Sequence, residues 1–350
     1  MPKVIVVGST GQVGRAVVAD FAAAGWDVTA VHRGRQSVPP SWGELGVSDV
    51  VADRSETGQL EAVLATGADT VVDVVAFDAA DGRQLLAAQE NVGSLVVVST
   101  LDVYVDDAGR GLEDGRDGVE NFPRFAVPIR EDNPTWAQDR GTYGSDKVVL
   151  EQTLRDGARV PVTALRPGGI HGPGSRTPRE LWVVLRALAG LESIPLPMAG
   201  GHALPTTATT NLARLARRSA EDALHGTAPG FRAFNSADPD ALSVTGIVQA
   251  LLDALGSAAE IVPLGDPDPE SPDFVAAPGA TPWSIPRSMA LDLRAAASVG
   301  YEPVHTYAEA APAAVASILE RLEGRTWQEA YPDMARAYGD GFGDVSPAEE

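Results

Sequence analysis

The sequence predicts an α/β protein in which a doubly wound parallel sheet is followed by a smaller, mixed C-terminal lobe. Two observations carry this prediction. Short apolar runs rich in Val recur through the N-terminal half, as expected for strands that are buried on both faces of a parallel sheet. Stretches with helical spacing lie between several of these runs, and they give repeated strand–helix–strand units.

The expected elements of the sheet follow in order along the chain. We predict strands at residues 3–8, 27–31, 47–51, 70–75, 94–99 and 160–165, and helices at 12–24, 58–65, 80–89 and 142–155. The segment 105–141 interrupts this rhythm. It is rich in Asp, Glu, Gly, Arg and Pro, which indicates a surface loop or a lid over a pocket.

The second half of the chain loses the regular alternation. We expect residues 1–166 to form the sheet domain, with a later strand near 230–236 returning to it, and residues 167–350 to form mainly a substrate-binding lobe with C-terminal helices. Helices are predicted at 178–189, 210–223, 245–255 and 307–322, Pro-rich loops at 194–206 and 262–287, and a polar, mobile tail after 339.

Composition limits the function classes. The chain has 350 residues, a formal net charge of −21 and no Cys, so we expect no nucleic-acid partner, no disulfide and no thiolate chemistry. No apolar stretch approaches the ~20 residues of a membrane span, and the chain starts in a strand without a signal peptide, which predicts a cytoplasmic protein that does not enter membranes. The five His are scattered without ligand spacing, so no metal is expected.

A glycine-rich turn follows the first predicted strand and opens the first helix. It reads Gly8-Ser9-Thr10-Gly11-Gln12-Val13-Gly14. Glycines allow the tight turn and the close approach of a phosphate, and the helix N-terminus offers free N–H groups to an anion. This segment predicts a binding site for the pyrophosphate of a dinucleotide, with contacts from Gly8, Thr10, Gly11, Gln12, Val13 and Gly14.

The end of the second strand bears on the choice of cofactor. Proteins that select NAD usually place a carboxylate there for the ribose 2′-hydroxyl, whereas this chain has His32 and Arg33. Basic residues favour a 2′-phosphate, so we expect NADP in preference to NAD. Asp53, just past the third strand, is a candidate partner of the adenine amino group or else a turn residue.

Tyr143 and Lys147 lie four residues apart, on one face of a predicted helix. A phenol is a poor base at neutral pH, and a nearby ammonium would bring the pKa of Tyr143 down toward the working range. Lys3 and Lys147 are the only lysines among 27 basic residues, which indicates a specific role for Lys147. Thr100 ends the fifth strand, where ligands bind in open α/β sheets, and its hydroxyl could orient a substrate oxygen.

These motifs occur in the order typical of a known family. The glycine turn, Ser99-Thr100 with Val103-Tyr104, Tyr143-x-x-x-Lys147, and Leu165-Arg166-Pro167 through Gly174 together resemble an extended short-chain dehydrogenase/reductase of the NAD-dependent epimerase/dehydratase type. The resemblance covers roughly residues 3–320. It implies a Rossmann-type sheet, Tyr143 as acid/base, Lys147 and Thr100 as its catalytic partners, and cofactor contacts at Ala76, Tyr143, Lys147, Pro167 and Ile170.

Two departures from the family pattern argue against sugar dehydration. Asn211 stands where the family usually has Asp, and Leu101-Asp102 replaces the Asp-Glu pair of the sugar dehydratases. The leading hypothesis is hydride transfer between C4 of the nicotinamide and a carbonyl or secondary alcohol of a small molecule. A nucleotide-sugar epimerase with tightly bound NAD and a non-catalytic NADP-sensing or scaffold protein are the alternatives.

Candidates for substrate contact come from the loops and the helix start of the second lobe, where polar and aromatic side chains could reach a ligand. They are His171, Arg176, Trp182, His202, Trp283 and Arg287. Arg176 or Arg287 could meet a phosphate or a carboxylate. Members of the family often pair, so a homodimer is an additional expectation.

Overall fold

Seven parallel strands form the central sheet of the computed structural model, which describes residues 1–137, 140–226, 228, 230–264 and 280–343. In spatial order they are β10 (Phe231–Ser236), β6 (Val162–Pro167), β5 (Leu95–Val98), β4 (Thr70–Asp73), β1 (Lys3–Val7), β2 (Asp27–His32) and β3 (Ser48–Val51). Every pair of neighbours runs parallel. The strand order reverses between β1 and β4, which is where a doubly wound sheet opens a crevice for ligands.

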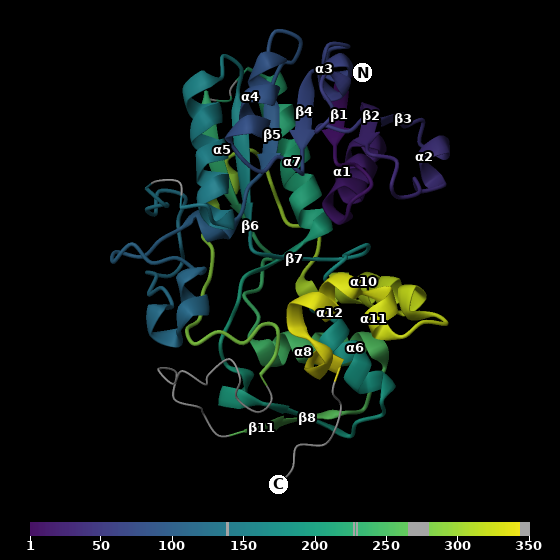
Figure 1. Ribbon diagram of the computed structural model, residues 1–350, viewed down its shortest axis with the longest axis vertical. Coiled ribbons are helices and arrows are strands. Elements are labelled where there is room, and N and C mark those ends of the chain that lie inside the picture. Colours follow the sequence, from purple (N-terminus) through teal and green to yellow (C-terminus); the bar gives the residue numbers. More distant parts are fainter. Residues whose placement is uncertain (138–139, 227, 229, 265–279, 344–350) are drawn as a thin grey trace.

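Helices cover both faces of the sheet (Figure 1). Val4 and Val6 of β1 pack with α1 (Gln12–Ala23) and α7 (Thr209–Leu224), whereas Ile5 and Val7 pack on the opposite side. That side is covered by α3 (Gln59–Leu64), α4 (Ala79–Ala87) and α5 (Tyr143–Gly157), and α2 (Ser41–Glu44) and α9 (Arg294–Ala297) are short peripheral turns. Burial on both faces explains why these strands are apolar at successive positions.

A second lobe lies below the carboxyl ends of the strands (Figure 1). Its core is formed by α6 (Leu181–Leu188), α8 (Val244–Leu255), α10 (Tyr307–Leu322), α11 (Trp327–Ala330) and α12 (Pro332–Tyr338). Two parallel strands, β8 (Ser193–Leu196) and β11 (Glu260–Pro263), pair at its far end, and β7 (Gly169–His171) pairs with β9 (Thr206–Ala208) near the sheet. No helix in the described ranges is long and apolar enough to cross a membrane.

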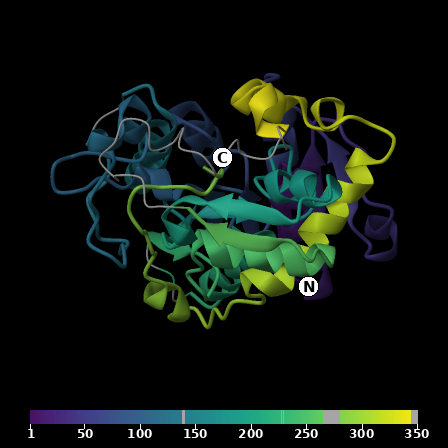
Figure 2. The ribbon, with the colours of Figure 1, turned by 90° about the horizontal axis from the view of Figure 1, so that it is seen from below.

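The segment between β5 and α5 lies beside the second lobe, in blue at the left of Figure 2. It contains short 3₁₀ turns at Leu101–Val103, Asp114–Asp117 and Val119–Asn121. Tyr104, Phe122 and Ile129 are buried in a small apolar cluster that also contains Ala237, Met289 and Leu291 from later in the chain. The predicted surface loop at 105–141 is therefore partly wrong, because this segment packs against other parts of the molecule and is more than an exposed lid.

The predicted fold class is confirmed by this architecture. One local expectation is wrong, since the Pro-rich region 194–206 contains parts of β8 and β9, where only a loop was expected. Most of the predicted loop at 262–287 and most of the predicted tail after 339 lie outside the described residues. Within the described part of that tail, Phe342 is buried and contacts Trp327, with ring centroids 5.6 Å apart.

Candidate active site

The glycine turn between β1 and α1 leaves no room for side chains at two of its three glycines. Gly8 has a φ of +85°, and a Cβ there would lie 2.5 Å from Cγ1 of Val75. A Cβ at Gly14 would lie 2.2 Å from the carbonyl oxygen of Gly8. Gly14 therefore lets α1 pack against the turn, while Gly8 supplies a conformation that other residues rarely adopt.

Gly11 differs from the other two glycines because the space around it is open. The nearest atom to a Cβ at Gly11 is the Gly8 carbonyl oxygen, at 3.4 Å. Gly11 is the N-cap of α1 and no side chain caps this helix end. The first N–H groups of a helix have no partner within the helix, so this turn fits the pyrophosphate of a dinucleotide.

The basic end of β2 is formed by arginines, with His32 occupied elsewhere. His32 is buried, its Nδ1 accepts a hydrogen bond from the Gly34 N–H, and its Nε2 lies 3.3 Å from Oδ2 of Asp49. Both ring nitrogens of His32 thus have partners within the protein, which argues against its predicted contact with a cofactor phosphate. Arg33 is exposed, and Arg35 lies 3.9 Å from Asp53.

Asp53 organises the turn that follows β3. Its Oδ1 accepts hydrogen bonds from the N–H and the hydroxyl of Ser55, at 3.1 and 2.7 Å. These bonds are the main reason why the pKa of Asp53 is lowered, with smaller contributions from the charges of Arg33 and Arg35. Both predicted roles of Asp53, as a turn residue and as a partner of the adenine amino group, are compatible with this geometry, because its other carboxylate oxygen makes only a long contact with Arg35.

A cavity of about 320 Å³ is lined both by predicted catalytic residues and by predicted cofactor contacts. It lies where β5, α5, β7 and the end of β6 meet. Its wall includes the three predicted catalytic residues, Thr100, Tyr143 and Lys147, together with Val13, Pro167 and Ile170 from the predicted cofactor contacts, and Val74, Val98, Ser99, Leu101, Asp102, Leu112, Gly168, Gly169, Arg179 and Leu204. Residues far apart in sequence thus form one concave site, as expected for a ligand pocket.

Tyr143 opens α5 at the cavity wall and its side chain is 40% exposed. The pKa of its phenol is raised, first by burial and then by the negative charge of Asp102, while a hydrogen bond with the Thr100 side chain acts in the opposite direction. The sequence predicts that Lys147 lowers this pKa, and the structure shows the opposite direction. The ammonium of Lys147 lies 5.9 Å from the centre of the Tyr143 ring and donates to backbone carbonyl oxygens, so burial and the charge of Asp102 determine the direction of the shift.

Lys147 is 5% exposed and its ammonium is held by the ends of two strands. Nζ donates hydrogen bonds to the carbonyl oxygens of Ala76 and Val98, at 2.6 and 2.8 Å. Burial lowers the pKa of Lys147 to about 8, against the opposing charges of Asp73, Asp81 and Glu151. One donor of the ammonium is left for a further acceptor at the cavity wall. Ala76, a predicted cofactor contact, is fully buried and participates here through its carbonyl oxygen.

Two charged residues of the cavity were missed by sequence reasoning as functional candidates. Asp102 is partly buried, and burial together with the charge of Glu113 raises its pKa to about 6, while Arg179 opposes this rise. The guanidinium of Arg179 lies close to the backbone of β7, as shown by the distance of only 3.0 Å between its Nη1 and the position of a Cβ at Gly169. The only sequence signal was the position of Asp102 directly after the strand-end motif.

None of the six predicted substrate residues lines this cavity. Trp182 and Trp283 are 4% and 1% exposed and belong to the core of the second lobe. His171 is buried with Nε2 2.7 Å from Oδ2 of Asp238, and the exposed Arg176 pairs with Asp333 at 2.5 Å. Arg287 is not part of the cavity wall. The two tryptophans thus pack in the apolar core, and His171 and Arg176 are engaged with carboxylates of the protein.

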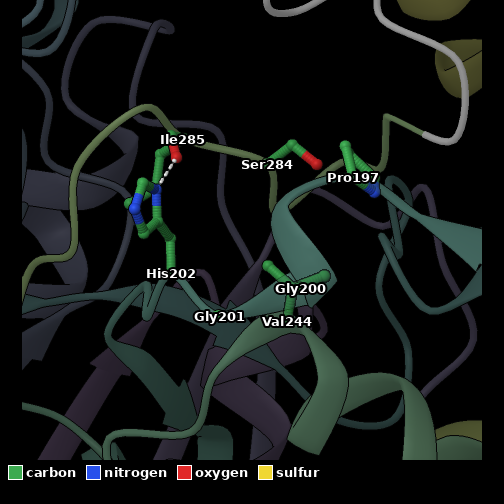
Figure 3. A pocket seen from close by; sticks show the side chains of 7 residues that line it. All are labelled: Pro197, Gly200, Gly201, His202, Val244, Ser284 and Ile285. Carbon is green, nitrogen blue, oxygen red and sulfur yellow. Dashed lines mark hydrogen bonds between the residues drawn. The ribbon is translucent and has the colours of Figure 1, made fainter. Parts of the chain in front are cut away.

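His202 lines a separate and much smaller cavity of about 10 Å³ in the second lobe (Figure 3). Its Nδ1 lies 2.7 Å from the carbonyl oxygen of Ile285. The cavity, between Pro197, Gly200, Val244 and Ser284, has room for about one water molecule. The structure therefore does not bring His202 to the main cavity, and this predicted substrate contact is corrected as well.

Comparison with known proteins assigns the N-terminal half. Residues 8–181 match a family model described as NAD(P)H-binding. Over 154 residues the chain is 32% identical to 2′-dehydrokanamycin reductase of Streptomyces kanamyceticus. That match covers 44% of this chain and 38% of the reductase, so the chain corresponds to well under half of the length of this relative.

Solved structures share the fold over nearly the whole chain. UDP-glucose-4-epimerase from Stenotrophomonas maltophila, with bound NAD, has a TM-score of 0.68 at 16% identity, covering 96% of this chain and all of that one. A UDP-galactose 4-epimerase gives 0.64 at 18%, and dTDP-glucose 4,6-dehydratase from Bacillus anthracis, in complex with NAD, gives 0.65 at 16%. These two cover 91% and 93% of this chain and 99% of their own lengths. The predicted NAD(P)-binding Rossmann fold is confirmed.

Proposed function

We propose that this protein is an NADP-dependent reductase of a small-molecule carbonyl. The proposal is supported by the match of residues 8–181 to the NAD(P)H-binding family model and by the fold, which resembles that of the extended short-chain dehydrogenases/reductases. The observation that carries the proposal is the shared cavity of Thr100, Tyr143 and Lys147 beside Val13 of the cofactor turn. A carbonyl compound in this cavity would lie against both hydroxyls and the expected nicotinamide end of the cofactor.

Thr100, Tyr143 and Lys147 each have a separate role in the proposed reduction. A bound NADPH would supply the hydride from C4 of its nicotinamide. The hydroxyls of Thr100 and Tyr143 would hold the substrate oxygen, and the phenol of Tyr143 would give its proton to that oxygen as it becomes an alcohol. The phenol is protonated at neutral pH and so has a proton to give in the direction of reduction, while its raised pKa by itself makes it a weaker acid. Lys147 would bind the nicotinamide ribose through its remaining donor.

The preference for NADP rests on the arginines after β2. Arg33 is exposed, and the Arg35 side chain is 71% exposed with a long contact of 3.9 Å to Asp53, so both guanidinium groups could reach a phosphate near the expected ribose. A guanidinium binds a phosphate through two parallel hydrogen bonds, and a bare 2′-hydroxyl offers no charge in return. His32 does not contribute, because both of its ring nitrogens are engaged within the protein.

Arg179 is the residue we propose for recognition of a polar substrate group, in place of Arg176 and Arg287. It is the arginine on the cavity wall, across the same space as Asp102 and Thr100. Its guanidinium could donate hydrogen bonds to a hydroxyl, carboxylate or phosphate oxygen. This role is separate from the proton step and can be removed without touching it.

The epimerase alternative is tested by the fate of the cofactor. Epimerases retain NAD through a transient oxidation and a reduction, so heat-denatured protein should release stoichiometric NAD if this alternative holds. We expect little retained nucleotide, and NADPH oxidation when a ketone is added. The first probes are 2′-dehydrokanamycin, the compound named for the reductase relative, and UDP-galactose for epimerisation. Stoichiometric NAD with conversion of UDP-galactose would overturn the proposal.

The proton step is tested by Tyr143→Phe, with Tyr338→Phe as the control. Tyr338 is similarly exposed, at 47%, and lies in α12 of the second lobe. With a ketone that the parent protein reduces, we expect Tyr143→Phe to lower kcat by about 10²-fold to 10⁴-fold while the NADPH dissociation constant changes little. Tyr338→Phe should match the parent. Full activity of Tyr143→Phe would exclude the proposed role.

A further inference from the structure

Glu113, in the segment between β5 and α5, binds the N-terminus of the helix that carries Tyr143. Its Oε1 accepts a hydrogen bond from the Tyr143 N–H and its Oε2 accepts one from the Gly144 N–H, both at 3.1 Å. These are the first two N–H groups of α5, which have no partner within the helix. A carboxylate at this positive end of a 15-residue helix is favourable, and here it holds the backbone of the proposed acid.

The surroundings of Glu113 show that this contact belongs to a tightly packed joint. A Cβ at Gly111 would lie 2.2 Å from the Trp136 ring, and Trp136 donates its indole N–H to the Asp102 carbonyl oxygen at 2.9 Å. A Cβ at Gly144 would lie 2.2 Å from that same carbonyl oxygen. Trp136 thus connects Gly111 of this segment with Asp102 after β5, and Asp102 in turn contacts Gly144 at the start of α5.

Two further contacts connect the joint with the cavity and with the rest of the segment. Leu112, the neighbour of Glu113, lines the cavity beside Tyr143. Asp114 accepts hydrogen bonds from the Gly111 N–H at 2.8 Å and from Arg140 at 3.3 Å, and Arg140 lies over the Trp136 ring. The conformation of the segment is therefore fixed on both sides of Glu113.

We propose that Glu113 is a positioning residue that holds the first turn of α5, and with it the phenol of Tyr143, in register with Thr100 at the cavity wall. The proposal rests on the proposed function, because it gives Glu113 its meaning through the proton step. The thermodynamic contribution is twofold: the carboxylate orders two backbone amides, and its negative charge favours the protonated form of both Tyr143 and Asp102.

The test uses the full chain with Glu113→Ala and Glu113→Gln, and Glu120→Gln as the matched control. Glu120 is an exposed carboxylate of the same segment, so its variant makes the same change of charge away from α5. Amide exchange would be followed at Tyr143 and Gly144. Tyrosinate absorbance would be titrated with pH, and subtraction of the Tyr143→Phe titration isolates Tyr143.

In Glu113→Ala we expect amide exchange at Tyr143 and Gly144 to become about fivefold to tenfold faster, as for the loss of a helix cap. Glu113→Gln retains one acceptor and should show a smaller increase. In both variants the Tyr143 titration should move to lower pH, because Asp102 and Lys147 remain near the phenol and only the Glu113 charge is gone. Glu120→Gln should change neither quantity.

A kinetic readout separates positioning from loss of cofactor binding. With a ketone that the parent protein reduces, both Glu113 variants should lower kcat and leave the KM for NADPH within about twofold, since the glycine turn is untouched. Unchanged exchange and unchanged Tyr143 titration in Glu113→Gln would overturn the inference while the proposed function stands. If Tyr143→Phe is fully active, the proposed function fails instead, and the exchange result still decides the contact.

Discussion

Asp102 is an acidic residue of the cavity wall whose charge state should affect the stability of the protein. Its carboxylate is partly buried between Tyr143, Glu113 and Arg179. Its pKa is raised from 3.8 to about 6, so ionisation at neutral pH works against the folded state. A group whose folded pKa is raised contributes stability that is present below about pH 4 and is lost as the pH rises through about 6.

Replacement of Asp102 by Asn should therefore stabilise the protein at neutral pH. We expect a gain on the order of 1–2 kcal/mol in the free energy of unfolding at pH 7, because burial no longer opposes a charge. The gain should shrink as the pH falls through about 6 and vanish below the unfolded pKa of 3.8, where the carboxyl is protonated in both states. Chemical denaturation at several pH values measures it, with Asp107→Asn, an exposed carboxylate, as control. A gain that does not depend on pH would contradict the assignment.

Lys147 should give cofactor binding a pH dependence. Its ammonium has a pKa lowered to about 8, so it loses its charge as the pH rises through that value. We expect the affinity for NADPH, measured by fluorescence titration, to fall above about pH 8 and to be constant below about pH 7. Lys147→Met should bind NADPH more weakly and without this pH dependence. Lys3→Met replaces the other lysine, at the exposed start of β1, and should behave as the parent does.

At the scale of elements, the turn between β1 and α1 separates packing from ligand binding. Gly14→Ala places a methyl group 2.2 Å from a carbonyl oxygen, so overpacking should lower the free energy of unfolding by about 1–3 kcal/mol. Gly11→Ala meets its nearest atom only at 3.4 Å and should cost less than about 1 kcal/mol. It should instead weaken NADPH binding by tenfold or more, because its methyl group occupies the expected pyrophosphate site. Equal losses of stability in the two variants would argue against this division.

The sequence revealed those elements whose pattern has a single physical explanation. Apolar runs buried on two faces predicted the strands, and a glycine turn between a strand and a helix predicted the cofactor site. Tyr143 and Lys147 were found because their four-residue spacing fixes a common helix face whatever the rest of the fold does. The periodicity of one element was sufficient in each of these cases.

Sequence reasoning failed where a side chain's direction depends on several elements. Arg176 and Arg179 precede the same helix three residues apart, and only the turn between β7 and α6 decides that Arg179 faces the cavity while Arg176 meets Asp333. Glu113 becomes a helix cap through a contact across 30 positions of the chain. Trp182 and Trp283 were predicted to contact the substrate from a helix start and a loop. The helices of the second lobe pack together, however, and bury both side chains.

At the scale of the whole molecule, hydrogen bonds connect the cofactor turn to the second lobe. The Gln12 side chain donates to the Gly172 carbonyl oxygen at 3.1 Å, and the Gly174 N–H donates to the Ser317 hydroxyl of α10 at 3.0 Å. A ligand bound at the glycine turn would thus contact an element that touches both lobes. Its binding energy should add to the stability of the folded state as a whole.

Asn211 supports this connection between the lobes and gives a physical reason for its departure from the family pattern. Its amide nitrogen donates to Asp238 and to the His305 carbonyl oxygen, at 2.8 and 2.7 Å, and its amide oxygen accepts from the N–H groups of Val304 and His305. Asp238 also binds His171 and Thr206. An ionised Asp at 211 could not donate, and it would place a second negative charge beside Asp238.

Cofactor choice can therefore be measured as stabilisation of the whole molecule. A ligand that binds only the folded state adds about 2.7 kcal/mol at a hundredfold excess over its dissociation constant, so the Tm shift reports affinity. We expect a larger shift with NADP than with NAD. The double variant Arg33→Ala, Arg35→Ala should reduce the NADP shift to that of NAD and leave the NAD shift unchanged, because only the 2′-phosphate loses its partners.

The control for this comparison is Arg159→Ala, which removes an arginine that is 67% exposed, paired with Glu90 and located just beyond the C-terminal end of α5. It loses the same kind of charge from an already acidic surface, so it accounts for the general effect of a more negative protein on a phosphate-bearing ligand. A shift for NAD that equals or exceeds that for NADP in the parent protein would overturn the assignment of Arg33 and Arg35. Equal losses in Arg159→Ala and in the double variant would instead attribute the preference to net charge.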